Sequence, residues 1–273
     1  MSARFRALPA AAALAVGVLA ANVHAQTAAP APAPAPAPAA AEPAPPYTLT
    51  GNFGIYSQYI FRGLTQTDTK PAFQGGFDFT HESGFYLGTW GSNISWISDS
   101  GACGHGCSLE WDVYGGWKKV WNEEWGLDVG VLQYFYPGSY NPGFSSANTT
   151  ELYIAGSWKW LSLKFSDSVS GKTFGVPNSR GTWYLDLTAA YPINDQWTAI
   201  GHVGRQEYHG NNNGVDNSLL NYTDWKLGLT YTFAGSWTVG GYWTDTNTNS
   251  SVYTIAGKNI GKSTGTAFIQ KTF

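Results

Sequence analysis

From residue 47 to residue 273, apolar and polar positions alternate in short segments that are separated by Gly, Asn, Asp, Ser or Pro. Side chains along a β-strand point to opposite faces with a period of two, so this pattern predicts an all-β protein. Twelve such segments occur, and they predict an antiparallel sheet of about 12 strands. They span residues 48–63, 71–81, 85–97, 109–120, 126–136, 150–160, 161–168, 181–191, 196–208, 221–233, 236–245 and 263–273.

Each predicted strand has one apolar face and one polar face. In the tenth segment, Trp225, Leu227 and Leu229 alternate with Asp224 and Lys226. The core of a soluble protein would absorb the apolar face. It would not explain why the opposite face is lightly charged and rich in Gly, Ser, Thr and Tyr. An apolar face toward lipid and a polar face toward a lumen explain both, which predicts a transmembrane antiparallel β-barrel.

The connections between the segments alternate between short and long. This is the asymmetry of bacterial outer-membrane barrels, which have short periplasmic turns and long extracellular loops. An even number of strands also places both ends of the barrel chain on the turn side. The short connections are residues 82–84, 121–125, 160–161, 192–195 and 234–235, and the long ones are 64–70, 98–108, 137–149, 169–180, 209–220 and 246–262.

The last segment predicts how the barrel closes. An unpaired edge strand is a liability in a sheet, so we expect residues 263–273 to pair with the first strand. The terminal aromatic residue, Phe273, resembles the signal that the barrel-assembly machinery recognises, and we expect that machinery as a partner during biogenesis. Lys271 departs from the apolar residues of its face, and we expect its side chain to extend toward the membrane interface.

The composition agrees with a surface in contact with lipid. The chain has 13 Trp, 16 Tyr and 14 Phe, and only 12% of its residues are charged, against about 25% in ordinary soluble domains. It contains no apolar run of the length that a membrane helix needs, about 18 residues or more. The net charge of −3 gives no basic footprint, so we expect no nucleic-acid partner.

The first 25 residues have the pattern of a cleaved signal peptide. Arg4 and Arg6 precede a short apolar run, and Val23-His24-Ala25 supplies a small-x-Ala cleavage motif. Alternate prolines in the Ala/Pro-rich tract that follows predict a disordered, extended linker, which acts either as a plain spacer or as a tether in the periplasm. The predicted domains are a signal peptide at residues 1–25, a linker at 26–46 and a barrel at 47–273, which is exported to the bacterial outer membrane.

Three blocks near the start of the predicted barrel resemble a known family. They read GNFGIYSQYIFRGLTQ at residues 51–66, PAFQGGFD at 71–78 and SGFYLGTWGSNISW at 83–96. They resemble the TorF-type porin family of proteobacterial outer-membrane proteins. The resemblance implies an outer-membrane barrel with channel activity, and it carries over no catalytic residue, cofactor or metal. The Ala/Pro tract and the loop that contains Cys103 and Cys107 depart from the family's pattern.

The charged residues of the polar face are the one constellation that the pattern connects with function. If this face lines a lumen, they tune the passage of ions and small polar solutes. We therefore expect a porin-like channel for passive diffusion, without enzymatic activity or a cofactor. The alternative is a plugged, structural barrel, or one that acts in adhesion or as a receptor through its loops. The predicted lumen-lining residues are Arg62, Asp78, Glu110, Asp112, Lys118, Asp128, Glu151, Lys159, Lys164, Asp186, Asp224 and Lys226.

Two further groups of residues allow more than one interpretation. Arg205 and Glu207 form either a solute constriction with Arg62 or an ordinary charged rim. Cys103 and Cys107 are the only cysteines, and export through an oxidising compartment predicts a loop disulfide between them. A metal site that uses the intervening histidine is the weaker alternative, because few ligands are in view. No sequence motif connects a nucleophile to a base, so we expect no enzyme.

Overall fold

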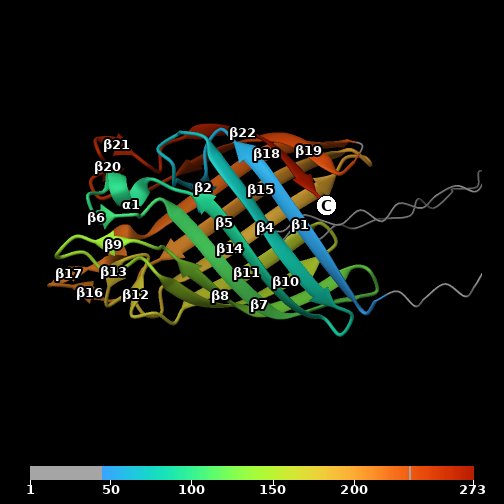
Figure 1. The fold of residues 1–273 in the computed structure, drawn as a ribbon, viewed down its shortest axis with the longest axis horizontal. Helices are drawn as coiled ribbons and strands as arrows, with labels where there is room; N and C mark the ends of the chain where they lie inside the picture. The colour runs from blue at the N-terminus through green and yellow to red at the C-terminus, as the bar shows by residue number, and fades with distance from the viewer. Residues whose placement is uncertain (1–44, 234) are drawn as a thin grey trace, which may run out of the picture.

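The computed structural model describes residues 45–233 and 235–273, and these form a closed barrel of 12 antiparallel strands (Figure 1). The predicted signal peptide and nearly all of the predicted linker lie outside the described residues. Among the described residues, no helix is long and apolar enough to cross a membrane. The barrel strands are β1 (Tyr47–Tyr56), β4 (Ala72–His81), β5 (Phe85–Asn93), β7 (Leu109–Trp121), β8 (Trp125–Phe135), β10 (Thr149–Trp158), β11 (Leu161–Ser168), β14 (Trp183–Pro192), β15 (Trp197–Glu207), β18 (Tyr222–Phe233), β19 (Trp237–Thr246) and β22 (Thr264–Thr272).

The long connections gather at one end of the barrel, opposite the end where β1 begins (Figure 1). We call these the loop end and the turn end. Several loops contain secondary structure of their own, which satisfies part of their backbone hydrogen bonding. These elements are the pairs β2 (Ile60–Phe61) with β3 (Leu64–Thr65), β6 (Cys103–His105) with β9 (Ser139–Tyr140), β12 (Lys172–Thr173) with β13 (Val176–Pro177), β16 (Asn211–Asn212) with β17 (Val215–Asp216) and β20 (Thr254–Ile255) with β21 (Lys258–Asn259), the helix α1 (Trp96–Asp99) and the 3₁₀ helix Asn217–Leu220.

The first and last strands close the barrel, as the sequence predicts. β1 pairs with β22 in antiparallel register, from Asn52 opposite Thr272 to Tyr56 opposite Phe268. The seam continues to the last residue, because Phe273 and Gly51 exchange two backbone hydrogen bonds of 2.9 and 2.7 Å. Closure therefore removes the edge that either strand would otherwise expose.

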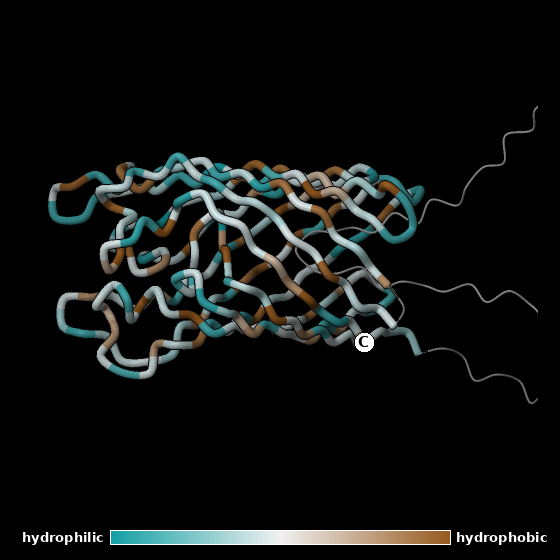
Figure 2. Tube along the Cα trace, turned by 90° about the horizontal axis from the view of Figure 1, so that it is seen from above, coloured by the Kyte–Doolittle hydropathy of each residue, from teal (hydrophilic) through white to brown (hydrophobic). Residues whose placement is uncertain are grey.

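The outer surface is apolar and bordered by aromatic residues at both ends. Hydrophobic positions recur along the strands, as the hydropathy colouring shows (Figure 2). The arrangement is the one that membrane-spanning barrels present to lipid, with an apolar band between two aromatic girdles. Exposed aromatic residues at the turn end include Trp121, Trp125, Trp158, Trp160, Tyr191, Trp197 and Phe273, and those at the loop end include Trp111, Trp225 and Trp243. Lys271 lies on this surface with its Nζ 5.3 Å from the ring centroid of Trp237.

Two predicted strands are shorter than the alternation suggests. The first segment was expected to run to residue 63, but β1 ends at Tyr56 and the chain then folds into the β2–β3 hairpin. The third was expected to run to residue 97, but β5 ends at Asn93 and α1 follows. In both places the alternating sequence pattern continues past the rim of the barrel. The residues beyond the rim pack inside the mouth of the barrel instead of against lipid.

Candidate functional site in the barrel interior

The polar face of each strand points into the barrel, so the interior carries most of the predicted charged residues. On β7, for example, Glu110 and Asp112 are 0% and 7% exposed. The alternate residues Leu109 and Trp111 are 44% and 46% exposed. The same alternation places the predicted residues Asp78, Glu110, Asp112, Lys118, Asp128, Glu151, Asp186, Asp224 and Lys226 on the interior face.

Lys159 does not belong to this interior set. It lies in the tight turn between β10 and β11 with a φ of 54°, and its side chain is 45% exposed. Its Nζ lies 3.3 Å from a carboxylate oxygen of Glu124 in the neighbouring turn. The sequence prediction counted Lys159 as part of a strand, but the two-residue turn takes it out of the alternation.

The loop between β1 and β4, residues 57–71, enters the barrel, and we call it the lumen loop. Its first two side-chain contacts are with strands on opposite sides of β1 in the barrel. Gln58 Nε2 donates a hydrogen bond of 2.8 Å to Thr264 Oγ1 on β22. Tyr59 Oη donates one of 2.8 Å to Glu110 Oε1 on β7. The lumen loop is therefore fixed inside the rim of the barrel and does not extend away from it.

The tip of the lumen loop reaches the far side of the barrel. Arg62 Nη2 donates to Glu151 Oε2 on β10 at 2.8 Å, and Arg62 Nη1 donates to Gln206 Oε1 on β15 at 2.9 Å. These two strands are well separated from β1 in both directions around the sheet. The lumen loop therefore spans the interior near the loop end, and Arg62 is its contact with the opposite wall.

The conformation of the tip explains how an arginine reaches this position. Arg62 and Gly63 are the two central residues of the β2–β3 hairpin, with φ values of 46° and 78°. Positive φ at both positions is the requirement of a type I′ turn. A Cβ on Gly63 would lie 2.5 Å from Thr246 Cγ2 and 2.6 Å from Asp224 Cβ, so only glycine allows the turn to approach the wall this closely.

Three aromatic rings surround the Arg62 guanidinium. Its Cζ lies 4.3 Å from the ring centroid of Tyr184, 4.9 Å from that of Phe61 and 5.7 Å from that of Phe174. A cation within about 6 Å of an aromatic ring face is attracted by the ring quadrupole. The side chains of Arg62 and Glu151 are only 8% and 3% exposed. The guanidinium is thus held by one carboxylate, one amide oxygen and several rings.

More carboxylates than Glu151 surround this position. Glu110 and Asp112 alternate on the interior face of β7, and Asp112 pairs in register with Tyr134 on β8. Tyr134 Oη in turn donates to Glu151 Oε2 at 3.2 Å. Glu110 Oε2 and Asp112 Oδ1 are buried without a hydrogen-bond partner in the described part of the chain. Three carboxylates therefore gather around Tyr134, and only one of them is paired with Arg62.

A second polar cluster lies on the neighbouring strands. His202 on β15 lies between Asp224, at 2.9 Å from its Nε2, and Asp186, at 3.3 Å from its Nδ1. Tyr184 Oη donates to the other oxygen of Asp224 at 2.8 Å. Both ring nitrogens of the histidine face a carboxylate oxygen, which is the arrangement that an imidazolium with two N–H donors satisfies.

Tyrosines and lysines line the wall between these clusters and the turn end. Tyr114 Oη donates to Asp78 Oδ1 at 2.7 Å, and Tyr86 Oη donates to Asp128 Oδ1 at 2.6 Å. Lysine ammonium groups lie over interior rings, with Lys118 5.2 Å from Tyr86, Lys164 4.0 Å from Tyr153 and Lys226 5.2 Å from Tyr242. The interior charges are therefore supported by aromatic side chains along much of the barrel.

The remaining wall is polar but uncharged. β19, β22 and β1 are neighbours in the barrel. Their inward positions include Thr238, Thr244, Thr266 and Gln270, all of which are buried. Tyr56 Oη donates to Gln270 Oε1 at 2.5 Å. The interior thus has a charged side and a side of hydroxyl and amide groups.

Several interior residues were not predicted from the sequence. His202 shares the face of Gln206 on β15, so the alternation alone indicates that it points inward. Lys164 of the predicted polar face, by contrast, does lie on the interior face of β11. The contacts of Tyr59 and Gln206 with the lumen loop depend on long-range folding, and no local pattern signals them.

Arg205 and Glu207 take the opposite direction from Gln206. The side chain of Arg205 is 39% exposed, and its Nη2 lies 2.5 Å from Glu207 Oε1. The hypothesis that this pair forms a constriction with Arg62 was wrong, because strand alternation puts both residues on the outer face near the rim.

The outer loops close part of the mouth with a small hydrophobic cluster. It contains Tyr59 of the lumen loop, Ile97 of α1, and Tyr134 and Tyr136 at the end of β8. Cys103 and Cys107 are joined in a disulfide beside it, and Cys107 is only 2% exposed. The described residues contain no group of three or more His, Cys, Asp or Glu side chains arranged to hold a metal ion.

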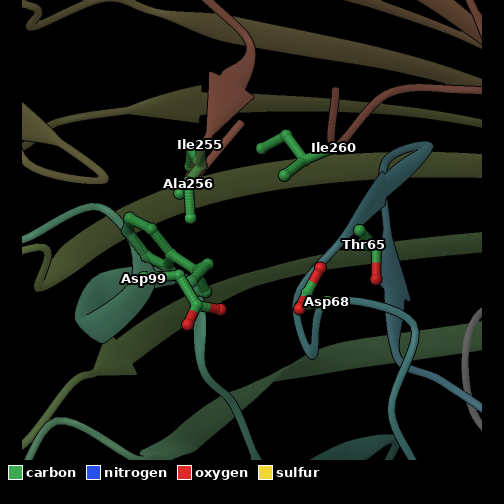
Figure 3. A pocket seen from close by; sticks show the side chains of 7 residues that line it. Thr65, Asp68, Asp99, Ile255, Ala256 and Ile260 are labelled. Carbon is green, nitrogen blue, oxygen red and sulfur yellow. The ribbon is translucent and has the colours of Figure 1, made fainter. Parts of the chain in front are cut away.

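A small pocket opens at the loop end, where the lumen loop, α1 and the β20–β21 hairpin meet (Figure 3). Two carboxylates, Asp68 and Asp99, lie in its wall opposite Ile255 and Ile260. Lys258 Nζ lies 2.8 Å from Asp68 Oδ2 and ties the hairpin to the lumen loop. This hydrogen bond lowers the pKa of Asp68 below its usual value. Asp99 accepts a hydrogen bond of 2.6 Å from Ser95 Oγ at the start of α1, so only Asp68 of the two carboxylates joins two loops.

Comparisons with known proteins agree with this fold. Residues 40–273 match the model of a family described as a bacterial protein of unknown function, Gcw_chp. No curated protein matches the chain by sequence. This family description does not mention the TorF type, so the resemblance to TorF-type porins stays a prediction.

Among solved structures, the KdgM porin is similar at 11% identity with a TM-score of 0.50, over 82% of this chain and 99% of that one. The NanC porin is similar at 13% identity and a TM-score of 0.48, over 83% and 99% of the two chains. An outer membrane channel from Pseudomonas putida F1 is similar at 10% identity and a TM-score of 0.47, over 87% and 99%. At such low identity the likeness to the KdgM porin concerns the fold alone.

Proposed function

Since the chain belongs to the Gcw_chp family of bacterial proteins, whose function is unknown, we propose from its structure that it is a porin-like channel of the bacterial outer membrane. It passes small polar solutes or ions by diffusion, without a cofactor or energy coupling. The observation that carries this proposal is the combination of an apolar outer face with a charged inner face on one closed barrel. The fold shared with the KdgM porin supports it.

The orientation and partners follow from the same proposal. The turn end faces the periplasm and the loop end faces the exterior, as in other outer-membrane barrels. Lipid contacts the apolar band and the aromatic girdles, and the barrel-assembly machinery inserts the chain after export by its signal peptide. The TorF-type resemblance of residues 51–96 fits the same picture.

The charge balance of the interior favours cations. Acidic side chains are more numerous there than basic ones even when His202 is counted as an imidazolium, and rings of charge set the ion preference of a channel. The acids of the interior face are Asp78, Glu110, Asp112, Asp128, Glu151, Asp186 and Asp224, and its bases are Arg62, Lys118, Lys164, His202 and Lys226.

Planar-bilayer recording of the refolded protein tests the proposal. We expect step conductance, and under a potassium chloride gradient a reversal potential that shows cation preference. Lys118→Glu increases this preference, because its side chain faces the interior over Tyr86. Lys119→Glu is the matched control, since this neighbour lies on the opposite face of the same strand and is exposed. Absence of any step conductance from correctly folded barrels would refute the channel and favour a structural or adhesive role for the loops.

A further inference from the structure

Arg62 has the contacts of a bound ligand. Its guanidinium donates to acceptors on two separate strands, Glu151 on β10 and Gln206 on β15. Tyr184 is on β14, which lies between β10 and β15 in the barrel. Its ring covers the Arg62 guanidinium at a centroid distance of 4.3 Å. A planar guanidinium suits such a site, because its fork of donors reaches two acceptors while its face stacks on an aromatic ring. The wall residues therefore form a cation site without help from the lumen loop.

The wall offers more acceptor oxygens than Arg62 uses. Glu110 Oε2 and Asp112 Oδ1 are buried without a hydrogen-bond partner in the described part of the chain. Their residues are 0% and 7% exposed, and Asp112 pairs in register with the Tyr134 that hydrogen-bonds Glu151. A buried acceptor oxygen without a partner is costly, and an N–H donor of a solute that enters the lumen would relieve that cost.

The attachment of Arg62 allows exchange with a free cation. Arg62 is at the tip of a two-residue turn, so its side chain can leave the wall while the base of the lumen loop stays fixed by Gln58 and Tyr59. The contacts to be replaced are two hydrogen bonds and the ring faces, which a second guanidinium or an ammonium group can supply. Withdrawal of the side chain removes both of its hydrogen bonds to the far wall and its contact with the ring of Tyr184.

From these observations we infer that the wall around Glu151, Gln206 and Tyr184 is a recognition site for the cationic group of the permeating solute, and that Arg62 occupies it as a tethered substitute. The solutes of this class are small organic cations that carry a guanidinium or primary ammonium group. The inference rests on the proposed channel function and assigns it a substrate class.

Binding to the refolded full-length protein in detergent micelles tests the site independently of conductance. In Arg62→Ala, isothermal titration with L-arginine should give a dissociation constant in the millimolar range, whereas L-citrulline, which has the same shape without the charge, should not bind. In the wild type, arginine competes with a side chain whose effective concentration is on the order of millimolar or higher. A competitor whose effective concentration equals the dissociation constant halves the apparent affinity, so we expect binding to the wild type to be weaker by about two-fold or more.

Two further variants make the result decisive. Arg62→Gln keeps an amide donor near Glu151 and serves if Arg62→Ala does not fold, as judged by heat-modifiable gel migration. Adding Glu151→Gln to either variant should abolish arginine binding. Equal binding of arginine and citrulline, no binding to either folded Arg62 variant, or binding that survives Glu151→Gln would overturn the inference.

The channel itself is tested separately. In bilayers, arginine on the loop side should carry current through the wild type and more strongly through Arg62→Ala. Absence of conductance together with charge-selective binding would refute the proposed channel while leaving the cation site in place. Conductance without charge-selective binding would refute the cation site alone.

Discussion

Replacing Arg62 by alanine should destabilise the barrel by about 3 kcal/mol. The substitution leaves Glu151 buried with a side chain that is 3% exposed and without its cationic partner. Breaking a buried ion pair from one side typically costs about 3–5 kcal/mol, because a buried charge remains uncompensated. The lower end of this range applies here, since Tyr134 still donates a hydrogen bond of 3.2 Å to Glu151.

A double-mutant cycle separates this effect from simple loss of packing. Glu151→Gln should be strongly destabilising in the wild type, because it leaves Arg62 buried without a carboxylate. It should cost much less in the Arg62→Ala background, where it removes the uncompensated charge. Contacting residues in one network commonly show coupling energies of about 0.5–3 kcal/mol, and we expect a value in the upper half of that range.

The assay is reversible urea unfolding in phospholipid vesicles, followed by tryptophan fluorescence. Arg205→Ala is the matched control, because this arginine also pairs with a glutamate but is 39% exposed on the outer face. Exposed ion pairs contribute about 0–1 kcal/mol. If Arg62→Ala costs no more than Arg205→Ala, or if the cycle is additive within about 0.5 kcal/mol, the lumen loop does not engage the wall as described.

Three further predictions concern the loops and the seam. Gly63→Ala should cost more stability than Gly257→Ala in the same urea assay, because both glycines have φ near 78° but only Gly63 has a neighbour within 3 Å of an added Cβ; equal costs would exclude close packing at the tip. Deletion of Phe273 should lower the amount of assembled barrel in membrane fractions and leave the conductance of the assembled fraction unchanged; a changed conductance would assign the residue a role in the pore. The pKa of Asp68 is lowered by its hydrogen bond with Lys258, so the contact is fully present above the usual carboxyl pKa of about 4 and is lost at lower pH, as the pH falls through the lowered pKa of Asp68. Spin labels on the two loops should therefore move apart in acid, and Lys258→Ala should remove that pH dependence.

The sequence was sufficient to predict the barrel because lipid and water impose a local pattern. Every strand must satisfy lipid on one side and a polar interior on the other, so period-two alternation repeats in all twelve segments. The same rule predicts the direction of side chains such as Asp224 and Lys226 on β18. It also indicates His202 on β15, which is absent from the predicted lumen-lining residues. Direction toward the interior is thus readable from one strand at a time.

The lumen loop could not be predicted in this way. Alternation continues from β1 through residue 63, and nothing in the segment marks Tyr56 as the last residue of the strand. The positions of Arg62 and Glu151 are separated by 89 residues in the chain. Their contact depends on barrel closure, on the type I′ turn and on the space that Gly63 leaves at the wall. No window of a single strand contains that information.

Polar residues of the lumen loop are buried, which is the clearest structural sign that the loop is packed inside the barrel. Gln58, Thr65, Gln66 and Thr67 are each at most 6% exposed, although loops normally lie on the surface. Buried backbone and side-chain amide groups require hydrogen-bond partners. Some of the partners of the lumen loop belong to the barrel wall, and others belong to neighbouring loops. Thr65 N, for example, donates to Ile260 O at 2.9 Å.

These contacts also differ in how easily water or a solute replaces them. A neutral hydrogen bond contributes about 0.5–1.5 kcal/mol net and one to a charged group about 1.5–3 kcal/mol, because water or another donor can take the place of either partner. Apolar burial has no such substitute. The base of the lumen loop packs through Tyr59 into the hydrophobic cluster of the mouth, whereas the tip is held by Arg62 through groups that a hydrated cation can also bind. The loop is therefore fixed where it leaves β1, and the exchange proposed above involves only the Arg62 side chain, because Phe61 beside it packs against the rings of Tyr134 and Phe174.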